Sequence, residues 1–155
     1  MKIEYINPFL NAVDNAMETM IGVSPVRDKP YIKDSRTTTG DITGVIGFAE
    51  KRISGSVALS FPTKTILKIY ELMMGTPVEE INNEVDDIVG ELTNIVVGGA
   101  KKEFSELGLP FNISLPLVVS GTNHIIKHKH DNPVMVIPYS VEGNKFIMEI
   151  SLMVK

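Results

Sequence analysis

A long amphipathic stretch covers residues 83–108, where apolar residues recur at intervals of three and four positions. This period predicts one long helix with a continuous apolar face. The apolar positions are Val85, Ile88, Val89, Leu92, Val96, Ala100, Phe104 and Leu107. Four other residues recur about once per turn along the opposite side, and we expect them to point into solvent. They are Asp87, Glu91, Asn94 and Gly98.

Two further helices are predicted earlier in the chain from their end signals. Asn7 followed by Pro8 is typical of a helix N-cap and first helical position, and Gly22 follows the last apolar residue of that segment. Pro62 and Gly75 bracket a second amphipathic segment in the same way. We therefore expect one helix to begin at Pro8 and a second to begin just after Pro62.

Alternating apolar residues predict several β-strands. Residues 42–50 and 53–61 are two such runs joined by a very short link, which indicates a hairpin. After the long helix, four strand candidates follow at residues 111–121, 123–130, 133–142 and 145–154, with a hairpin turn at 142–144. Residues 23–33 read as an edge strand or an irregular segment, and residues 34–41 as a loop.

This order of elements predicts an α+β fold in which long amphipathic helices pack on an antiparallel β-sheet. A weak internal two-fold repeat accompanies it, because each half of the chain has a long helix followed by a strand hairpin. With 155 residues, the chain is expected to form a single domain, residues 1–155.

Composition narrows the classes of function. The net charge of −4 argues against nonspecific binding to nucleic acid or to an anionic membrane surface. The chain has no cysteine, which excludes disulfides and thiolate metal sites and fits a reducing cytoplasm. It also lacks the apolar run of a signal peptide or a membrane-spanning helix, so we expect a cytoplasmic protein.

The solvent-facing column on the long helix has the residue types of a working surface. Asn94 carries a carboxamide, which can hold a water molecule and a phosphoryl oxygen at the same time. Glu91, one turn earlier, is suited to pair with a basic residue of a partner. Gly98 costs about 1 kcal/mol against alanine in a helix, which suggests that a partner approaches the backbone there. Asp87 is either a further partner contact or a favourable charge near the helix N-terminus.

The alternative for the same column is a solvated face without function, since a Glu-x-x-Asn pattern also occurs by chance. A rival site is the set of alternating histidines His124, His128 and His130, because such an arrangement can bind Zn²⁺ or Cu²⁺. The interleaved Lys127 and Lys129 add positive charge that disfavours a cation. We therefore interpret this stretch as a solvated hairpin tip and expect no metal site on the chain.

Several motifs together give the chain a family resemblance: INPFLNAV, GSVALSFP, VDDIVGELTN, ISLPLVVSG, PVMVIPY and FIMEISL. With them the chain resembles the CheC/CheX/FliY family of chemotaxis phosphatases, and its CheX branch most. The family signature is an acidic residue or serine, a glutamate, an asparagine and a later proline. These map onto Asp87, Glu91, Asn94 and Pro116.

The resemblance implies a CheC-like fold and dephosphorylation of the aspartyl phosphate of a CheY-type response regulator, which terminates a chemotaxis signal. It makes Glu91 the anchor to the regulator's conserved lysine and Asn94 the residue that aligns the hydrolytic water. The expected cofactor, Mg²⁺, belongs to the regulator and none to this chain. Relatives pair through sheet edges, so a homodimer is expected.

The first helix reads NAVDNAMETM and has no second Glu-x-x-Asn, so the resemblance implies a single active site per chain. The alternative within the same fold is a noncatalytic module that only binds a response regulator or dimerises.

Overall fold

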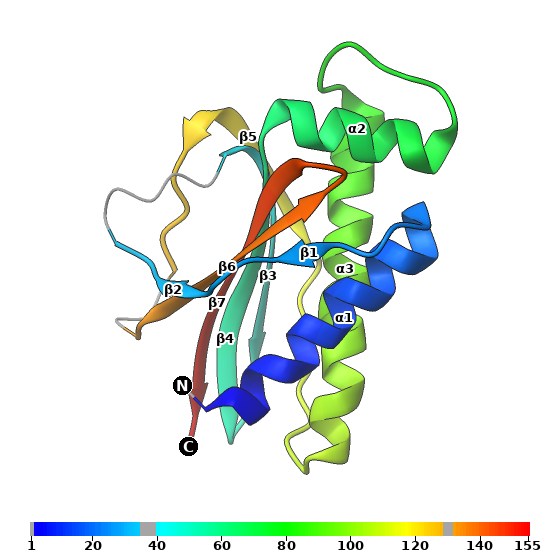
Figure 1. Ribbon diagram of the computed structural model, residues 1–155. Helices are drawn as coiled ribbons and strands as arrows, with labels where there is room; N and C mark the ends of the chain where they lie inside the picture. Colours follow the sequence, from blue (N-terminus) through cyan, green and yellow to red (C-terminus); the bar gives the residue numbers. More distant parts are fainter. Residues whose placement is uncertain (1, 35–39, 129–131) are drawn as a thin grey trace.

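The computed structural model describes residues 2–34, 40–128 and 132–155 and contains three helices and a seven-stranded sheet (Figure 1). The helices are α1 (Ile3–Ile21), α2 (Thr63–Met74) and α3 (Asn83–Glu106). The strands are β1 (Val26–Arg27), β2 (Tyr31–Ile32), β3 (Gly40–Ala49), β4 (Ile53–Phe61), β5 (Leu117–His124), β6 (Val134–Val141) and β7 (Asn144–Val154).

All strand pairs are antiparallel, in the order β1-β6-β7-β4-β3-β5, and β2 also pairs with β6. The helices α1 and α3 lie side by side on one face of this sheet, and α2 lies at the end where α3 begins (Figure 1). The expected α+β fold with helices on an antiparallel sheet is therefore confirmed. A long helix followed by a strand hairpin occurs twice, as α1 before β3–β4 and α3 before β6–β7.

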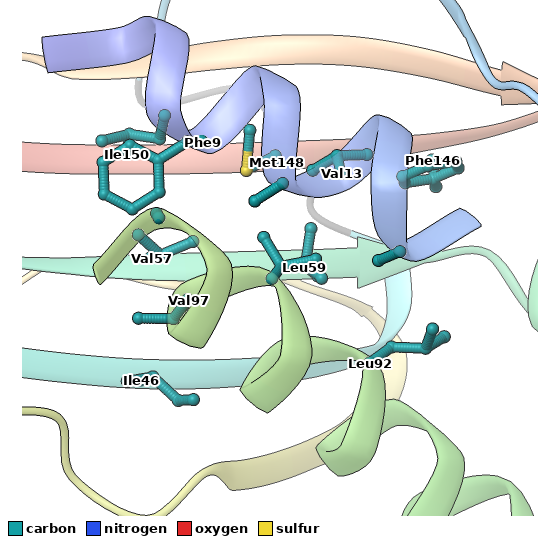
Figure 2. Close-up of a cluster of buried hydrophobic side chains, with 14 of the residues drawn as sticks. Phe9, Val13, Ile46, Val57, Leu59, Leu92, Val97, Phe146, Met148 and Ile150 are labelled. Atoms are coloured by element: carbon teal, nitrogen blue, oxygen red, sulfur yellow. The ribbon is translucent and has the colours of Figure 1, made fainter. Parts of the chain in front are cut away.

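The main core fills the space between the two long helices and the sheet (Figure 2). Phe9 and Val13 of α1 and Leu92 and Val97 of α3 point toward the strands. They pack against alternate apolar residues of the strands, which are Ile46, Val57, Leu59, Phe146, Met148 and Ile150. All ten of these side chains are fully buried.

The long helix α3 has the predicted apolar face. Asn82 caps its N-terminus by accepting a hydrogen bond of 3.0 Å from the backbone N–H of Val85. Every predicted apolar position is buried except Leu107, which is 51% exposed. The helix ends before Leu107, and Gly108 turns the chain with a φ of 77°, so Leu109 enters the core instead.

The prediction for the start of α1 was wrong. The helix begins at Ile3, and Pro8 lies inside it instead of at its first position, so Asn7 is not the N-cap. Pro8 cannot donate the N–H hydrogen bond to the carbonyl oxygen of Glu4, and its ring crowds that carbonyl. Ile6 belongs to the hydrophobic core and Pro8 is buried, and this burial offsets the loss. The predicted end at Gly22 is confirmed by its left-handed φ of 70°.

The strand hairpins agree with the alternation of apolar residues. Strands β3 and β4 pair along their length, and β6 and β7 are joined through Glu142 and Gly143, with φ values of 49° and 78°. Residues 23–33 contain the short edge strands β1 and β2, as expected. Of the predicted 34–41 loop, residues 35–39 lie outside the described residues, whereas Gly40 and Asp41 begin β3.

The two strands predicted for 111–121 and 123–130 were wrong in their limits. One strand, β5, crosses the boundary between them, and residues 111–116 contain only an isolated bridge from Ile113 to Phe48. Pro116 has no N–H to donate to a sheet, which explains why regular pairing begins only at Leu117. After β5, the chain leaves the sheet and runs through His128 without regular structure.

The sheet face opposite the long helices is also buried where it meets His128. Glu149 on this face is fully buried, and its Oε1 accepts hydrogen bonds from Lys33 Nζ at 2.7 Å and His128 Nε2 at 3.2 Å. The other ring nitrogen, Nδ1, lies 2.5 Å from Ser56 Oγ. The His128 side chain is 1% exposed, so its predicted place on a solvated hairpin tip was wrong.

Both ring nitrogens of His128 are therefore engaged and leave no lone pair for a metal ion. His124 at the end of β5 has Nε2 at 2.5 Å from Thr43 Oγ1 and Nδ1 at 2.8 Å from the carbonyl oxygen of Gly121. His130 and Lys129, which belong to the same predicted tip, lie outside the described residues. Across residues 2–34, 40–128 and 132–155, no helix is both long and apolar enough to cross a membrane.

Candidate functional site

The column predicted on α3 lies on the solvent-facing side of the helix. Asp87, Glu91 and Asn94 are exposed, and Gly98 is half-buried with open space around its Cα. Within the described part of the chain, no hydrogen bond or ion pair engages the side chain of Glu91 or Asn94. Both side chains are therefore available to a second molecule.

The rotation of α3 that exposes this column is fixed from its buried side. Thr93 is fully buried and donates its hydroxyl to the carbonyl oxygen of Val89 at 2.7 Å. The helix lies so close to β3 at this point that a Cβ on Gly44 would stand 2.0 Å from the Thr93 hydroxyl oxygen. Because only glycine permits this approach, the face with Val89 and Thr93 stays against the sheet and Asn94 stays outside.

A groove of about 500 Å³ runs between the N-terminal half of α3 and the chain that enters β5. It is lined by Asp86, Asp87, Gly90, Glu91, Asn94, Leu115, Pro116 and Val118. All four signature positions therefore share one groove. Asp87, Glu91 and Asn94 come from α3, whereas Pro116 comes from the chain just before β5. The other predicted contact residue, Gly98, lies on the same helix one turn beyond the groove.

Gly90 lines this groove on the side of α3. A Cβ at this position would lie 3.5 Å from Val118 Cγ2 and 3.8 Å from Pro116 Cγ, which is ordinary van der Waals contact. An alanine would therefore fit at this position without a clash. The missing side chain of Gly90 leaves space between α3 and β5 that a methyl group would partly fill.

The groove is acidic. Its described lining includes the carboxylates of Asp86, Asp87 and Glu91 and no basic side chain. The Oδ1 atom of Asp86 is buried and has no hydrogen-bond partner among the described residues. Three negative charges along one wall favour a partner that brings a cationic group into the groove.

Sequence reasoning missed four groove residues: Asp86, Gly90, Val118 and Leu115. The last is the most exposed large hydrophobic residue in the described part of the chain, at 89%. Its proximity to α3 depends on how β5 pairs with β3, which no local pattern reveals. The run Leu115-Pro116-Leu117, where a proline interrupts the predicted strand 111–121, was the signal that could have drawn attention to it.

A protein-family model described as chemotaxis phosphatase CheX matches residues 42–140 of the chain. The CheY-P phosphatase CheX of Thermotoga maritima is 28% identical over 145 residues, which cover 91% of this chain and 90% of that protein.

Solved structures agree with these sequence matches. A CheC-like superfamily protein from Shewanella sp. PV-4 is 38% identical, with a TM-score of 0.93 and 99% of both chains covered. A complex of CheX with CheY, BeF3 and Mg²⁺ from Borrelia burgdorferi contains a chain that is 23% identical, with a TM-score of 0.80 and 99% of both chains covered. At this lower identity, the Borrelia match shows the fold.

Proposed function

The chain belongs to the CheX family of chemotaxis phosphatases, and from this premise we propose that it hydrolyses the aspartyl phosphate of a CheY-type response regulator. The name of the Thermotoga relative, CheY-P phosphatase, supports this substrate. The observation that carries the proposal is the shared groove in which Glu91 and Asn94 stand exposed on α3 opposite Pro116. The chain is then a hydrolase of two-component signalling.

In the reaction, the oxygen of a water molecule forms a bond to phosphorus while the bond from phosphorus to the aspartyl oxygen breaks. The products are inorganic phosphate and the free aspartate of the regulator, and the water hydrogens go to phosphate or solvent. Asn94 acts by position: its carboxamide oxygen accepts a hydrogen bond from the attacking water, and its N–H group can donate to a phosphoryl oxygen. Holding the water in line supplies the few kcal/mol that this acceleration requires.

Glu91 anchors the regulator. Its carboxylate lies one helical turn before Asn94, so an ion pair with the regulator's conserved lysine sets how far the carboxamide enters the phosphorylated site. Asp87 continues the same acidic column toward the helix N-terminus and adds a second contact to the partner. The Mg²⁺ of the reaction belongs to the regulator, and the presence of CheY and Mg²⁺ together in the Borrelia complex supports this assignment.

We place the protein in the cytoplasm, with its regulator, and propose that it forms a homodimer through a sheet edge. Among the residues that the structure describes, the edge beyond β6 carries the short strands β1 and β2 and exposes Val26, Tyr31 and Ile32, at 66%, 43% and 57%. Pairing along this edge would cover apolar surface and leave the groove beside β5 open.

A test of the proposed activity uses a CheY-type regulator phosphorylated with acetyl phosphate and a tenth of that amount of this protein. Because Glu91 and Asn94 are not consumed, we expect loss of the phosphoryl group to accelerate through several turnovers per chain. The measurement is release of inorganic phosphate over time. Unchanged decay, or an effect limited to one equivalent, would instead assign the chain to the noncatalytic regulator-binding modules.

Gly98→Ala separates folding from docking. No atom lies within 4 Å of a Cβ built at this position, so alanine fits the isolated chain. Its higher helix propensity should raise the melting temperature by roughly 2–4 °C, which corresponds to about 1 kcal/mol in a chain of this length. If a regulator approaches the backbone at Gly98, the same variant should raise KM. A more stable variant with unchanged KM would remove Gly98 from the partner contacts.

A further inference from the structure

Leu115 is exposed beside the catalytic groove. Its side chain is 89% accessible, and Leu117 two residues later is 63% accessible. Single exposed leucines are common on protein surfaces and need no explanation by themselves. Leu115 differs because it lines the same groove as Glu91 and Asn94, so a molecule that fills this groove contacts the leucine as well as the carboxamide.

The chain that carries Leu115 is held in place on both sides. The N–H of Ser114 donates to the carbonyl oxygen of Gly47 at 3.0 Å, and the N–H of Gly47 donates to Ser114 Oγ at 3.2 Å. On the other side, Leu117 pairs with Val45 in the β3–β5 ladder. Leu115 is therefore presented by a fixed backbone, which lowers the conformational entropy that binding would cost.

The opposite wall of the groove supplies complementary chemistry. Asp86, Asp87 and Glu91 bring negative charge within the same groove as the leucine. Asp86 Oδ1 is buried and accepts no hydrogen bond from the described residues, so this wall contains a carboxylate oxygen that the described chain leaves unsatisfied. A partner that fits both walls has an apolar patch next to a basic group.

We propose that residues 114–117 form a docking shelf for the response regulator, with Leu115 as its apolar anchor. The inference rests on the proposed function and adds a residue that determines affinity for the regulator without taking part in hydrolysis. The occupant is the regulator and not a second copy of this chain, because a copy seated on the docking shelf would cover Asn94. The acidic wall then receives a basic group of the regulator while Leu115 contacts its apolar patch.

Leu115→Ala and Leu115→Asp test the docking shelf. We expect Leu115→Ala to raise KM for the phosphorylated regulator about tenfold, with Leu115→Asp higher still and kcat changed by less than about twofold. A truncated anchor loses contact area in the bound state, whereas the water and carboxamide remain in place. The matched controls are Leu107→Ala and Leu107→Asp, which alter a leucine of 51% exposure at the far end of α3 and should leave KM unchanged.

The readouts include initial rates, affinity for the regulator loaded with BeF3⁻ in place of the phosphoryl group, and sedimentation of the free chain. An unchanged KM in both Leu115 variants, or a fall in kcat at constant KM, would overturn the docking shelf. So would a Leu115 variant that dissociates a dimer, because the leucine would then contact a second copy. If the wild-type chain shows no turnover, the proposed function fails, yet the BeF3⁻ affinities still decide the role of Leu115.

Discussion

Asn94→Ala is expected to lower kcat for phosphate release about a hundredfold, which corresponds to a loss of about 3 kcal/mol of transition-state stabilisation. Alanine cannot accept a hydrogen bond from the attacking water, so the water must find its position by chance. The affinity for the BeF3⁻-loaded regulator should change by less than about threefold, because Glu91 and the rest of the groove remain. Stopped-flow phosphate release and a binding titration measure the two quantities.

The fold should tolerate this change. Asn94 is exposed, no described residue bonds to its side chain, and alanine is the better helix former. Asn15→Ala is the matched control, since it removes an exposed carboxamide from α1 outside the groove. It also tests the expectation of a single active site per chain. Full turnover in Asn94→Ala would exclude Asn94 as the residue that aligns the water, and a loss in Asn15→Ala would point to a second site.

The part of the site that lies on α3 could be predicted because its geometry is local. A period of 3.6 residues places Glu91 and Asn94 on one side as soon as Val89 and Leu92 are assigned to the other. Burial of Val89 and Leu92 confirms that orientation. The hairpins were predictable for a similar reason, since short links between alternating runs leave few alternatives.

The other wall of the groove could not be predicted, because it depends on contacts distant in the chain. Leu115 and Pro116 reach α3 only through the pairing of β5 with β3, and the strand alternation does not specify that partner. The error at His128 has the same origin. The residues next to His128 in the sequence do not indicate that it is buried. Its partners Ser56 and Glu149 are distant in the chain and lie on the second face of the sheet. Buried polar groups are nearly always hydrogen-bonded, and which groups meet depends on how the strands pair.

Glu91→Lys is expected to lower kcat/KM about a hundredfold, at least as strongly as Asn94→Ala. The cause differs, because Glu91→Lys weakens association with the regulator and leaves the hydrolytic step in place. The substitution places a positive charge where the conserved lysine of the regulator must enter, so attraction becomes repulsion. Glu91→Ala, which only removes the attraction, should cost about tenfold. Rates at saturating regulator separate association from hydrolysis. Under saturation, kcat should lie much closer to the wild-type value than kcat/KM does, because Asn94 is intact.

A control variant separates the position of the new charge from the change in net charge. Glu106→Lys makes the same change in net charge on the same helix but outside the groove, so it should leave kcat/KM within about twofold, as expected for a distant surface charge screened by salt. The decisive combination pairs Glu91→Lys with a regulator whose conserved lysine is changed to glutamate. Affinity for the BeF3⁻-loaded form should return in the double variant if the two side chains touch, since the ion pair is restored with its signs exchanged. An additive loss in the double variant would mean that Glu91 acts on another part of the regulator, and the register that brings Asn94 to the phosphoryl group would need a different anchor.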